Sequence, residues 1–312
     1  MSRGEFQLRK GLTPQEWLRL NSLSRFFLWI HFYDPHGNYE PPPPFDRMYD
    51  PDYSGTASGK WYGITMEERE RLIQDPRELE HIKALYAGEV SYVDQKIGEL
   101  LSQMDRLDLM EQTLIVLTSD HGESLTEHDY FFDHSVCLYD PSLKVPLIFR
   151  FPNGNGAGKR VPNLAGLTDI LPTILDSLGA EAPRNLDGQS LLEDSDNPSP
   201  DSASRTVISA IFRGEIQGGK RLVSVRSADR KYIRTSAWWA DLRFMPASEE
   251  FYDLTLDRGE TRNMVTEEAD QVASFRDLAA TYWERWHATT EPRSSPLSEE
   301  DTEILRSLGY VQ

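Results

Sequence analysis

The chain has little cysteine, little positive charge and no long apolar run. Its single cysteine, Cys137, excludes an intrachain disulfide. The 33 Lys and Arg residues are outnumbered by 51 Asp and Glu, and the net charge of −18 argues against a nucleic-acid partner, because phosphates would be repelled. The longest apolar run, residues 26–30, is far shorter than the roughly 20 apolar residues that a membrane span requires. We therefore expect neither a nucleic-acid partner nor a membrane span.

The first 20 residues also lack the apolar core of a secretory signal. They carry Arg3, Lys10 and Arg19 among polar neighbours, whereas a signal peptide contains a continuous apolar segment of about 7 to 15 residues. We expect no signal peptide in this chain. The compartment stays open, with the cytoplasm as the default expectation.

The most informative stretch is residues 113–123, TLIVLTSDHGE. Its first six residues are apolar or β-branched, which is typical of a strand buried on both faces of a parallel sheet. Ligands of open α/β sheets bind beyond the carboxyl ends of the strands, so Asp120 and His121 are the first candidate site residues. Gly122 would permit a sharp turn that points both side chains at one ion. The alternative is that Asp120 and Gly122 only form a loop.

A second apolar segment, residues 26–32, also predicts a buried strand that ends in polar residues. His36 follows it, between Pro35 and the proline run at residues 41–44, which stiffens the loop. A lone histidine is more often structural than functional. Its place just beyond a strand end makes His36 a candidate site residue.

Helical and strand patterns alternate through the first two thirds of the chain. Between residues 76 and 107 apolar residues recur at three- and four-residue steps, which predicts a sheet-covering helix whose charged residues, and His81, face solvent. A strand is expected at 144–149 and a helix at 167–178. Before both, the loop at 124–140 carries His128 and His134, which also follow a strand end.

The last third has a different pattern. The composition of residues 193–204, EDSDNPSPDSAS, predicts a flexible connection. Short strand candidates at 206–212, 222–225, 231–234 and 250–254 follow without long helices between them, which favours an antiparallel sheet. Helices are expected at 266–287 and 299–308. The predicted fold is α/β, with a mostly parallel sheet flanked by helices in a domain at 1–195, and a small antiparallel sheet with a helix in a domain at 205–312.

Several stretches, in this order, together resemble the C-terminal portion of a sulfatase, in the alkaline-phosphatase-like superfamily of metal-dependent sulfate and phosphate ester hydrolases. They are FFLWIHFYDPHGNYEPPPPF, YAGEVSYVDQKIGELL, TLIVLTSDHGESLTEH, DHSVCLYDPSLKVPLIF, RSADRKYIRT, EEFYDLTLDRGETRNM and LRSLGYV. No single motif would suffice, but the ordered set covers nearly the whole chain. The resemblance implies a partial sulfatase catalytic domain at 1–195.

The resemblance also implies roles for individual residues. Asp120 and His121 match a metal-ligating pair, with His121 where many relatives have Asn. The implied metal is Ca²⁺, and this donor pair would also admit Mn²⁺ or Zn²⁺. His36 matches the histidine that contacts the sulfate oxygens and the leaving group. His134 lies near the position of a sulfate-binding lysine, although Val136 is that lysine's strict counterpart.

Two parts of a complete sulfatase are missing from these 312 residues. One is a pair of aspartates that supplies further metal ligands, and the other is a C-x-P-S-R or S-x-P-S-R motif whose first residue becomes the formylglycine nucleophile. Cys137 lacks the required Pro and Arg after it, and reads as a small buried side chain. We therefore expect a fragment that is inactive alone, poorly soluble, and complemented by a separate N-terminal half chain.

The expected substrate is a small-molecule sulfate ester, and its identity stays open because specificity would reside in loops such as residues 46–63 and in the missing half. Two alternatives remain. The chain could be a phosphoryl-ester hydrolase or transferase of the same superfamily, or a non-catalytic remnant or binding module.

Overall fold

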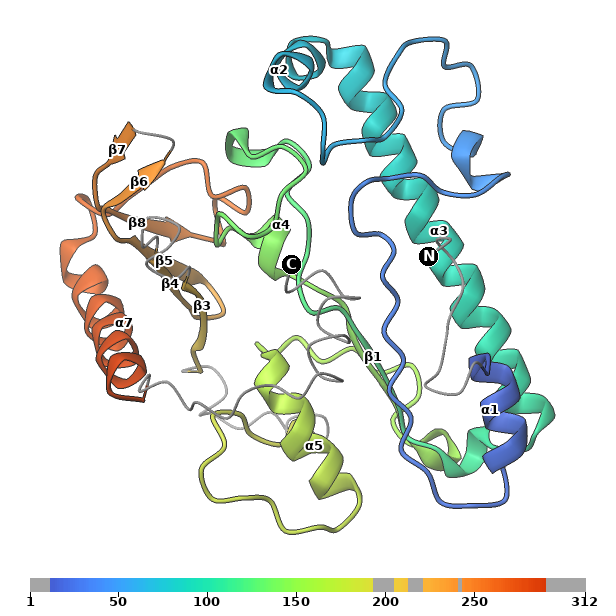
Figure 1. Ribbon diagram of the computed structural model, residues 1–312. Helices are drawn as coiled ribbons and strands as arrows, with labels where there is room; N and C mark the ends of the chain where they lie inside the picture. Colours follow the sequence, from blue (N-terminus) through green and yellow to red (C-terminus); the bar gives the residue numbers. More distant parts are fainter. Residues whose placement is uncertain (1–11, 193–204, 213–220, 241–242, 290–312) are drawn as a thin grey trace. The chain divides into compact units, whose positions relative to one another are not determined.

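The computed structural model describes residues 12–192, 205–212, 221–240 and 243–289, and it divides into two compact units (Figure 1). We call them the N-terminal unit, whose described part is residues 12–113, and the C-terminal unit, residues 114–294. Each is described by itself. The predicted domains at 1–195 and 205–312 stay a prediction, because the connection at 193–204 lies outside the described residues.

The N-terminal unit is helical. A capping box starts its first helix, because the Thr13 side chain accepts a hydrogen bond from the Glu16 amide while the Glu16 carboxylate accepts one from the Thr13 amide. The longest helix begins after Asp75, whose side chain caps it, and has proline at its first position. The elements are α1 (Pro14–Asn21), η1 (Phe45–Arg47), α2 (Met66–Gln74), α3 (Pro76–Arg106) and η2 (Met110–Gln112). No helix in the described part of the chain is long and apolar enough to cross a bilayer.

The first half of α3 is covered by a loop rather than by water. His81 is buried, stacks on Tyr53 with ring centroids 3.3 Å apart, and bonds Asp50 through Nδ1 at 2.9 Å. Glu78 is also buried and accepts hydrogen bonds from Tyr53 and Thr56. The interpretation of His81 as part of a solvated face was therefore wrong, since the loop at residues 50–57 brings matching polar groups to it.

The strand predicted at residues 26–32 does not form. The segment is irregular, no described strand forms a ladder with it, and Phe27 and Trp29 are 75% and 73% exposed. Alternate residues are more and less exposed, as in a strand with one covered face. The pattern was correct about the local alternation, but a strand also requires a neighbour with which to share hydrogen bonds.

The C-terminal unit begins with a two-stranded antiparallel ladder that pairs Ile115 with Arg150 and Thr118 with Leu147. The predicted mostly parallel sheet is not confirmed. The described strands of this region, β1 and β2, pair only with each other, and they run antiparallel. Its strands are half-exposed, since each has only the other as neighbour. The elements are β1 (Ile115–Thr118), η3 (Glu127–Asp129), α4 (Asp140–Leu143), β2 (Leu147–Arg150), η4 (Pro152–Gly154), η5 (Leu167–Asp169) and α5 (Ile170–Ser177).

The predicted antiparallel sheet with a helix is confirmed. Four strands pair in the order β3-β4-β5-β8, each antiparallel to its neighbour. They are β3 (Val207–Phe212), β4 (Arg221–Arg226), β5 (Arg230–Thr235) and β8 (Ser248–Asp253), with a small ladder of β6 (Trp238–Ala240) and β7 (Arg243–Met245), and α7 (Ala269–Thr289). The helix expected at 299–308 lies outside the described residues.

Both faces of this sheet are covered. On one face α7 lies along the sheet (Figure 1). Its Val272 and Ala279 pack against Val223, Tyr232 and Phe251. On the other face the apolar side chains of the sheet pack against the segment around α4. These side chains are Leu222, Ile233, Tyr252 and Leu254, which meet Leu138, Tyr139 and Leu143. The sheet therefore supports the segment that follows the candidate histidines.

Candidate functional site

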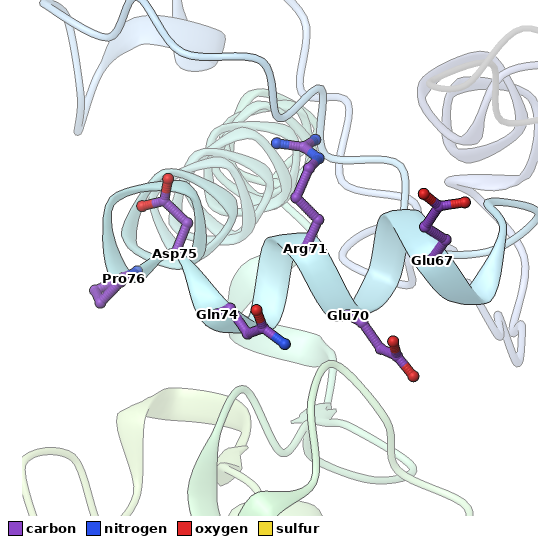
Figure 2. A pocket seen from close by; sticks show the side chains of 6 residues that line it. All are labelled: Glu67, Glu70, Arg71, Gln74, Asp75 and Pro76. Carbon is purple, nitrogen blue, oxygen red and sulfur yellow. The ribbon is translucent and has the colours of Figure 1, made fainter.

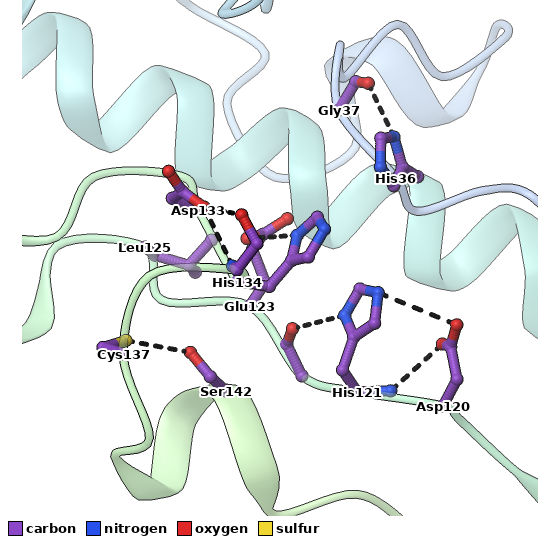
Figure 3. Close-up of polar contacts among 12 residues, drawn as sticks. His36, Gly37, Asp120, His121, Glu123, Leu125, Asp133, His134, Cys137 and Ser142 are labelled. Carbon is purple, nitrogen blue, oxygen red and sulfur yellow. Dashed lines mark hydrogen bonds and ion pairs between the residues drawn. The ribbon is translucent and has the colours of Figure 1, made fainter. Parts of the chain in front are cut away.

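Asp120 and His121 lie directly after β1, as predicted, and they face one another (Figure 3). The His121 amide donates to Asp120 Oδ1 at 3.0 Å, and His121 Nε2 lies 3.7 Å from Asp120 Oδ2. His121 Nδ1 lies 2.9 Å from the Gly122 carbonyl oxygen, so Nδ1 is the donor there. The nitrogen near the carboxylate is therefore Nε2, which places an imidazole nitrogen and a carboxylate oxygen side by side.

Gly122 has a different role from the one that the sequence suggested. The structure does not give it a positive φ. Its amide donates to the Ser142 carbonyl at 2.8 Å, and a Cβ atom at position 122 would lie 2.0 Å from the Pro141 carbonyl oxygen. The absence of a side chain thus permits close backbone approach rather than a left-handed turn. The backbone after His121 is held against α4.

α4 is in turn fixed to the C-terminal sheet by a cluster of charged side chains, two of which, Lys231 and Glu260, are buried. Asp140 Oδ1 pairs with Arg226 and lies 2.9 Å from Lys231 Nζ, and the Asp140 amide donates to Glu260 at 2.7 Å. Lys231 is fully buried and also pairs with Glu260 at 2.6 Å. Burial alone would raise the pKa of Asp140, but the charges of Lys231 and Arg226 outweigh it and lower that pKa. A continuous set of contacts therefore links β5 to His121.

His134 joins the pair after β1. Its ring stacks on His121 with centroids 3.9 Å apart and planes inclined by 16°, and its Nδ1 lies 3.2 Å from Glu123 Oε1 (Figure 3). Burial opposes a charge on this ring, but the hydrogen bond and charge of Glu123 outweigh it and raise the pKa of His134. The structure thus groups three of the predicted residues, Asp120, His121 and His134.

No firm role for Glu123 was expected, and its contact with His134 depends on a fold-back of the chain. Ser124 and Asp133 exchange two backbone hydrogen bonds of 3.0 and 3.2 Å, which return the loop so that position 134 meets position 123. The available signal in the sequence was that Glu123, an acidic residue, lies two positions after the candidate ligand His121. Nothing local in the sequence specified its partner.

Two other residues of this region are structural. His128 stacks on Tyr139 at 3.6 Å, and the Tyr139 hydroxyl donates to Glu250 on β8. Cys137 is buried and lies 3.3 Å from the Ser142 hydroxyl, and burial raises the pKa of its thiol. Its interpretation as a small buried side chain is confirmed, since a reactive cysteine requires a lowered pKa.

His36 belongs to the N-terminal unit. Its amide donates to the Tyr33 carbonyl at 2.9 Å, which closes a turn, and its Nδ1 lies 3.0 Å from the Gly37 carbonyl oxygen. Because each unit is described by itself, the expectation that His36 joins Asp120, His121 and His134 stays a prediction.

The described residues supply part of a metal site. Asp120 and His121 are ligand types that suit Mn²⁺ or Zn²⁺, and their facing O and N atoms could bind one ion. Within the described ranges, however, no group of three or more His, Cys, Asp or Glu side chains is arranged to hold a metal. The pair therefore fits a metal only as part of a larger ligand set.

A separate pocket lies along α2. It is lined by Glu67, Glu70, Arg71, Gln74, Asp75 and Pro76. Figure 2 shows the Glu67 and Glu70 side chains pointing away from one another, so their carboxylates do not converge on one point. The pocket contains none of the predicted site residues.

Family models match both halves of the chain. The model described as Sulfatase matches residues 15–180, and the model described as N-sulphoglucosamine sulphohydrolase, C-terminal, matches residues 126–281. Among curated relatives, arylsulfatase K of Rattus norvegicus is 34% identical over 197 residues, which are 61% of this chain and 33% of that protein. The multifunctional alkaline phosphatase superfamily protein PehA of Trinickia caryophylli is 27% identical over an alignment of 320 residues. The alignment covers 87% of this chain and 58% of that protein.

Solved structures show the same fold. The phosphonate monoester hydrolase of Agrobacterium radiobacter has a TM-score of 0.64 at 22% identity, over 87% of this chain and 59% of that one. BT4656, solved with its substrate D-glucosamine-2-N,6-O-disulfate, has a TM-score of 0.55 at 24% identity, and the match covers 72% of this chain and 45% of that one. The fold is that of the alkaline-phosphatase-like sulfatases. The chain spans about a third of the length of the arylsulfatase K relative and about half of these structures.

Proposed function

Because the chain belongs to the sulfatase family, we propose that it provides part of the active site for metal-dependent hydrolysis of a small-molecule sulfate ester. Asp120 and His121 would ligate the divalent metal, and His36 and His134 would contact the ester. The observation that carries the proposal is the grouping of Asp120, His121 and His134 directly after β1, with His134 held by Glu123.

His134 is suited to bind an anion. Glu123 engages Nδ1 and favours the protonated ring, so Nε2 would donate a hydrogen bond to a sulfate oxygen. Stacking on His121 fixes the plane of the ring, which reduces the entropy lost when the ester binds. When protonated, His134 would therefore act as an oriented hydrogen-bond donor beside the metal pair.

The family resemblance assigns His36 to the leaving group. The Gly37 carbonyl accepts a hydrogen bond from Nδ1–H, so Nε2 is the nitrogen left for the ester. In the doubly protonated imidazolium form, Nε2 would give its proton to the departing alcohol oxygen. A divalent metal, when bound, would neutralise charge on the sulfate oxygens, and Ca²⁺ is the ion that the family implies. Asp120 and His121 would hold it together with ligands from outside the described residues.

We further propose that these 312 residues do not turn over an ester by themselves. The sequence contains neither C-x-P-S-R nor S-x-P-S-R, so it holds no residue that would become formylglycine. The attacking group and the paired aspartates would come from a complementing N-terminal half.

A phosphoryl-ester hydrolase of the same superfamily is the second candidate. It is favoured by the likeness to PehA and to a phosphonate monoester hydrolase. The two functions are distinguished by comparing 4-nitrophenyl sulfate with 4-nitrophenyl phosphate once a complementing half is present. Failure to bind a metal or either ester would instead indicate a non-catalytic remnant or binding module.

Metal binding tests the proposal without requiring turnover. Mn²⁺ is titrated into the chain and followed by its electron paramagnetic resonance signal. We expect Asp120→Ala to weaken Mn²⁺ binding by about tenfold or more, because one of two placed donors is lost and loss of even an outer-shell partner costs about that much. Asp94→Ala removes an exposed carboxylate from α3 and should leave binding unchanged. Equal affinity in the two variants would contradict the assignment of Asp120 as a ligand.

A further inference from the structure

His36 lies among partly exposed aromatic rings. Its ring centroid is 4.8 Å from that of Tyr33 and 5.9 Å from that of Tyr62, with the planes inclined by 36° and 23°. Tyr33 and Tyr62 are 38% and 37% exposed. The imidazole therefore belongs to an aromatic group that remains accessible to a ligand.

Backbone contacts fix the position of Tyr62. Asn38 Oδ1 accepts hydrogen bonds from the amides of Trp61 and Tyr62, both at 2.6 Å, and the Tyr39 amide donates to the Gly59 carbonyl at 3.0 Å. Trp61 is buried. Two loops more than 20 residues apart are thus joined at the place where Tyr62 meets His36, so the ring arrangement is built into the fold.

Gly37 lets the Tyr62 ring approach the chain beside His36. A Cβ atom at position 37 would lie 2.8 Å from Tyr62 Cε2, which is closer than side chains pack. The Gly37 carbonyl also engages His36 Nδ1 at 3.0 Å (Figure 3). The same residue therefore orients the imidazole and admits the neighbouring ring.

We propose that Tyr33 and Tyr62 form an aromatic subsite beside His36 that selects esters whose alcohol portion is an aromatic ring. The inference rests on the proposed function in one respect, that His36 contacts the leaving group. An aromatic ring beside His36 would meet both tyrosines in offset or edge-to-face contact, and each such pair strengthens binding by about two- to tenfold.

Nuclear magnetic resonance of the full chain with ¹³C-labelled histidine tests the subsite, with the His36 signal assigned from a His36→Gln variant. The probes are phenyl sulfate, phenol and methyl sulfate. We expect phenyl sulfate and phenol to shift the His36 signal. Tyr62→Leu or Tyr33→Leu should weaken the binding of both probes by about two- to tenfold. Tyr62→Phe keeps the ring and should retain binding. Methyl sulfate binding should not respond to these changes.

Tyr49→Leu is the matched control, because Tyr49 is an exposed tyrosine of the same unit that bonds Ser91. The inference is overturned if Tyr62→Leu weakens the aromatic probes no more than Tyr49→Leu does. It is also overturned if glucose 6-sulfate shows the same ring dependence, since the subsite would then accept sugar faces.

The phenol arm separates this inference from the proposed function, because phenol carries no sulfate. Ring-dependent phenol binding in a chain that binds no metal would leave the subsite intact and defeat the proposed function. Asp120-dependent metal binding without any effect of Tyr33 or Tyr62 would defeat the subsite alone.

Discussion

At the scale of single residues, Gly122 controls how closely the chain after His121 approaches α4. A methyl group there would lie 2.0 Å from the Pro141 carbonyl oxygen, so the backbone must shift. We expect Gly122→Ala to lower the free energy of unfolding by about 1–3 kcal/mol, as overpacking does elsewhere. The midpoint of urea denaturation measures the change.

Gly98→Ala is the matched control for this prediction. Gly98 lies inside α3, and apart from its chain neighbours and the backbone of its own helix no atom would lie within 4 Å of the added Cβ. Alanine favours a helix by about 1 kcal/mol over glycine. This variant should be as stable as the parent or more stable. If Gly122→Ala behaved in the same way, the close approach to Pro141 would not constrain the site.

Individual site residues differ in how far the sequence could predict them. Asp120 and His121 were predictable because an apolar run that forms a strand ends just before them. The contact between Glu123 and His134 was not, because it depends on the Ser124–Asp133 fold-back and therefore on non-local pairing. The close approach of Gly122 to α4 likewise involves a partner some 20 residues away.

At the scale of elements, a charged contact joins α7 to the sheet. Arg276 donates two hydrogen bonds to Glu249 on β8, at 2.9 and 2.7 Å, and these bonds lower the pKa of Glu249 to about 2. A carboxylate whose pKa is lower in the folded state stabilises the fold above its unfolded pKa of about 4.3, and this stability is lost as the pH falls toward 2.

We therefore expect the parent to lose stability between about pH 4.5 and pH 2, and Arg276→Met to lose less over the same interval because the Glu249 pKa returns toward its usual value. Thermal melts recorded by circular dichroism at several pH values measure both slopes. Arg262→Met is the control, since Arg262 and its partner Glu267 are exposed and such pairs contribute little. Identical pH dependence in all three proteins would contradict the prediction.

The elements themselves were predictable where local pattern decides them. The capped helix starts and the antiparallel sheet of the last third follow from residues close in sequence. The predictions of a strand at 26–32 and of a parallel sheet around β1 were not confirmed. An apolar or alternating run becomes a buried strand only when neighbouring elements cover it. The buried state of His81 was missed for the same reason, since a distant loop covers it.

At the scale of the whole molecule, the segment at 26–32 leaves large apolar side chains at the surface. Phe27 and Trp29 lie on the exposed side of an extended segment, and Leu23 nearby is fully exposed. Exposed apolar segments with the alternation of a strand pair readily with other chains. The expectation of poor solubility, made from the sequence, now has specific residues on which it can be tested.

We expect the purified chain to self-associate, and Phe27→Lys combined with Trp29→Lys to shift it toward the monomer, because two like charges on one face of an extended segment oppose pairing. Size-exclusion chromatography with light scattering at several concentrations measures the mass. Leu256→Lys is the control, since Leu256 is an equally exposed but isolated apolar residue of the C-terminal unit. A parent chain that is monomeric at every concentration would show that this surface does not drive association, and would remove one physical reason for proposing a complementing half.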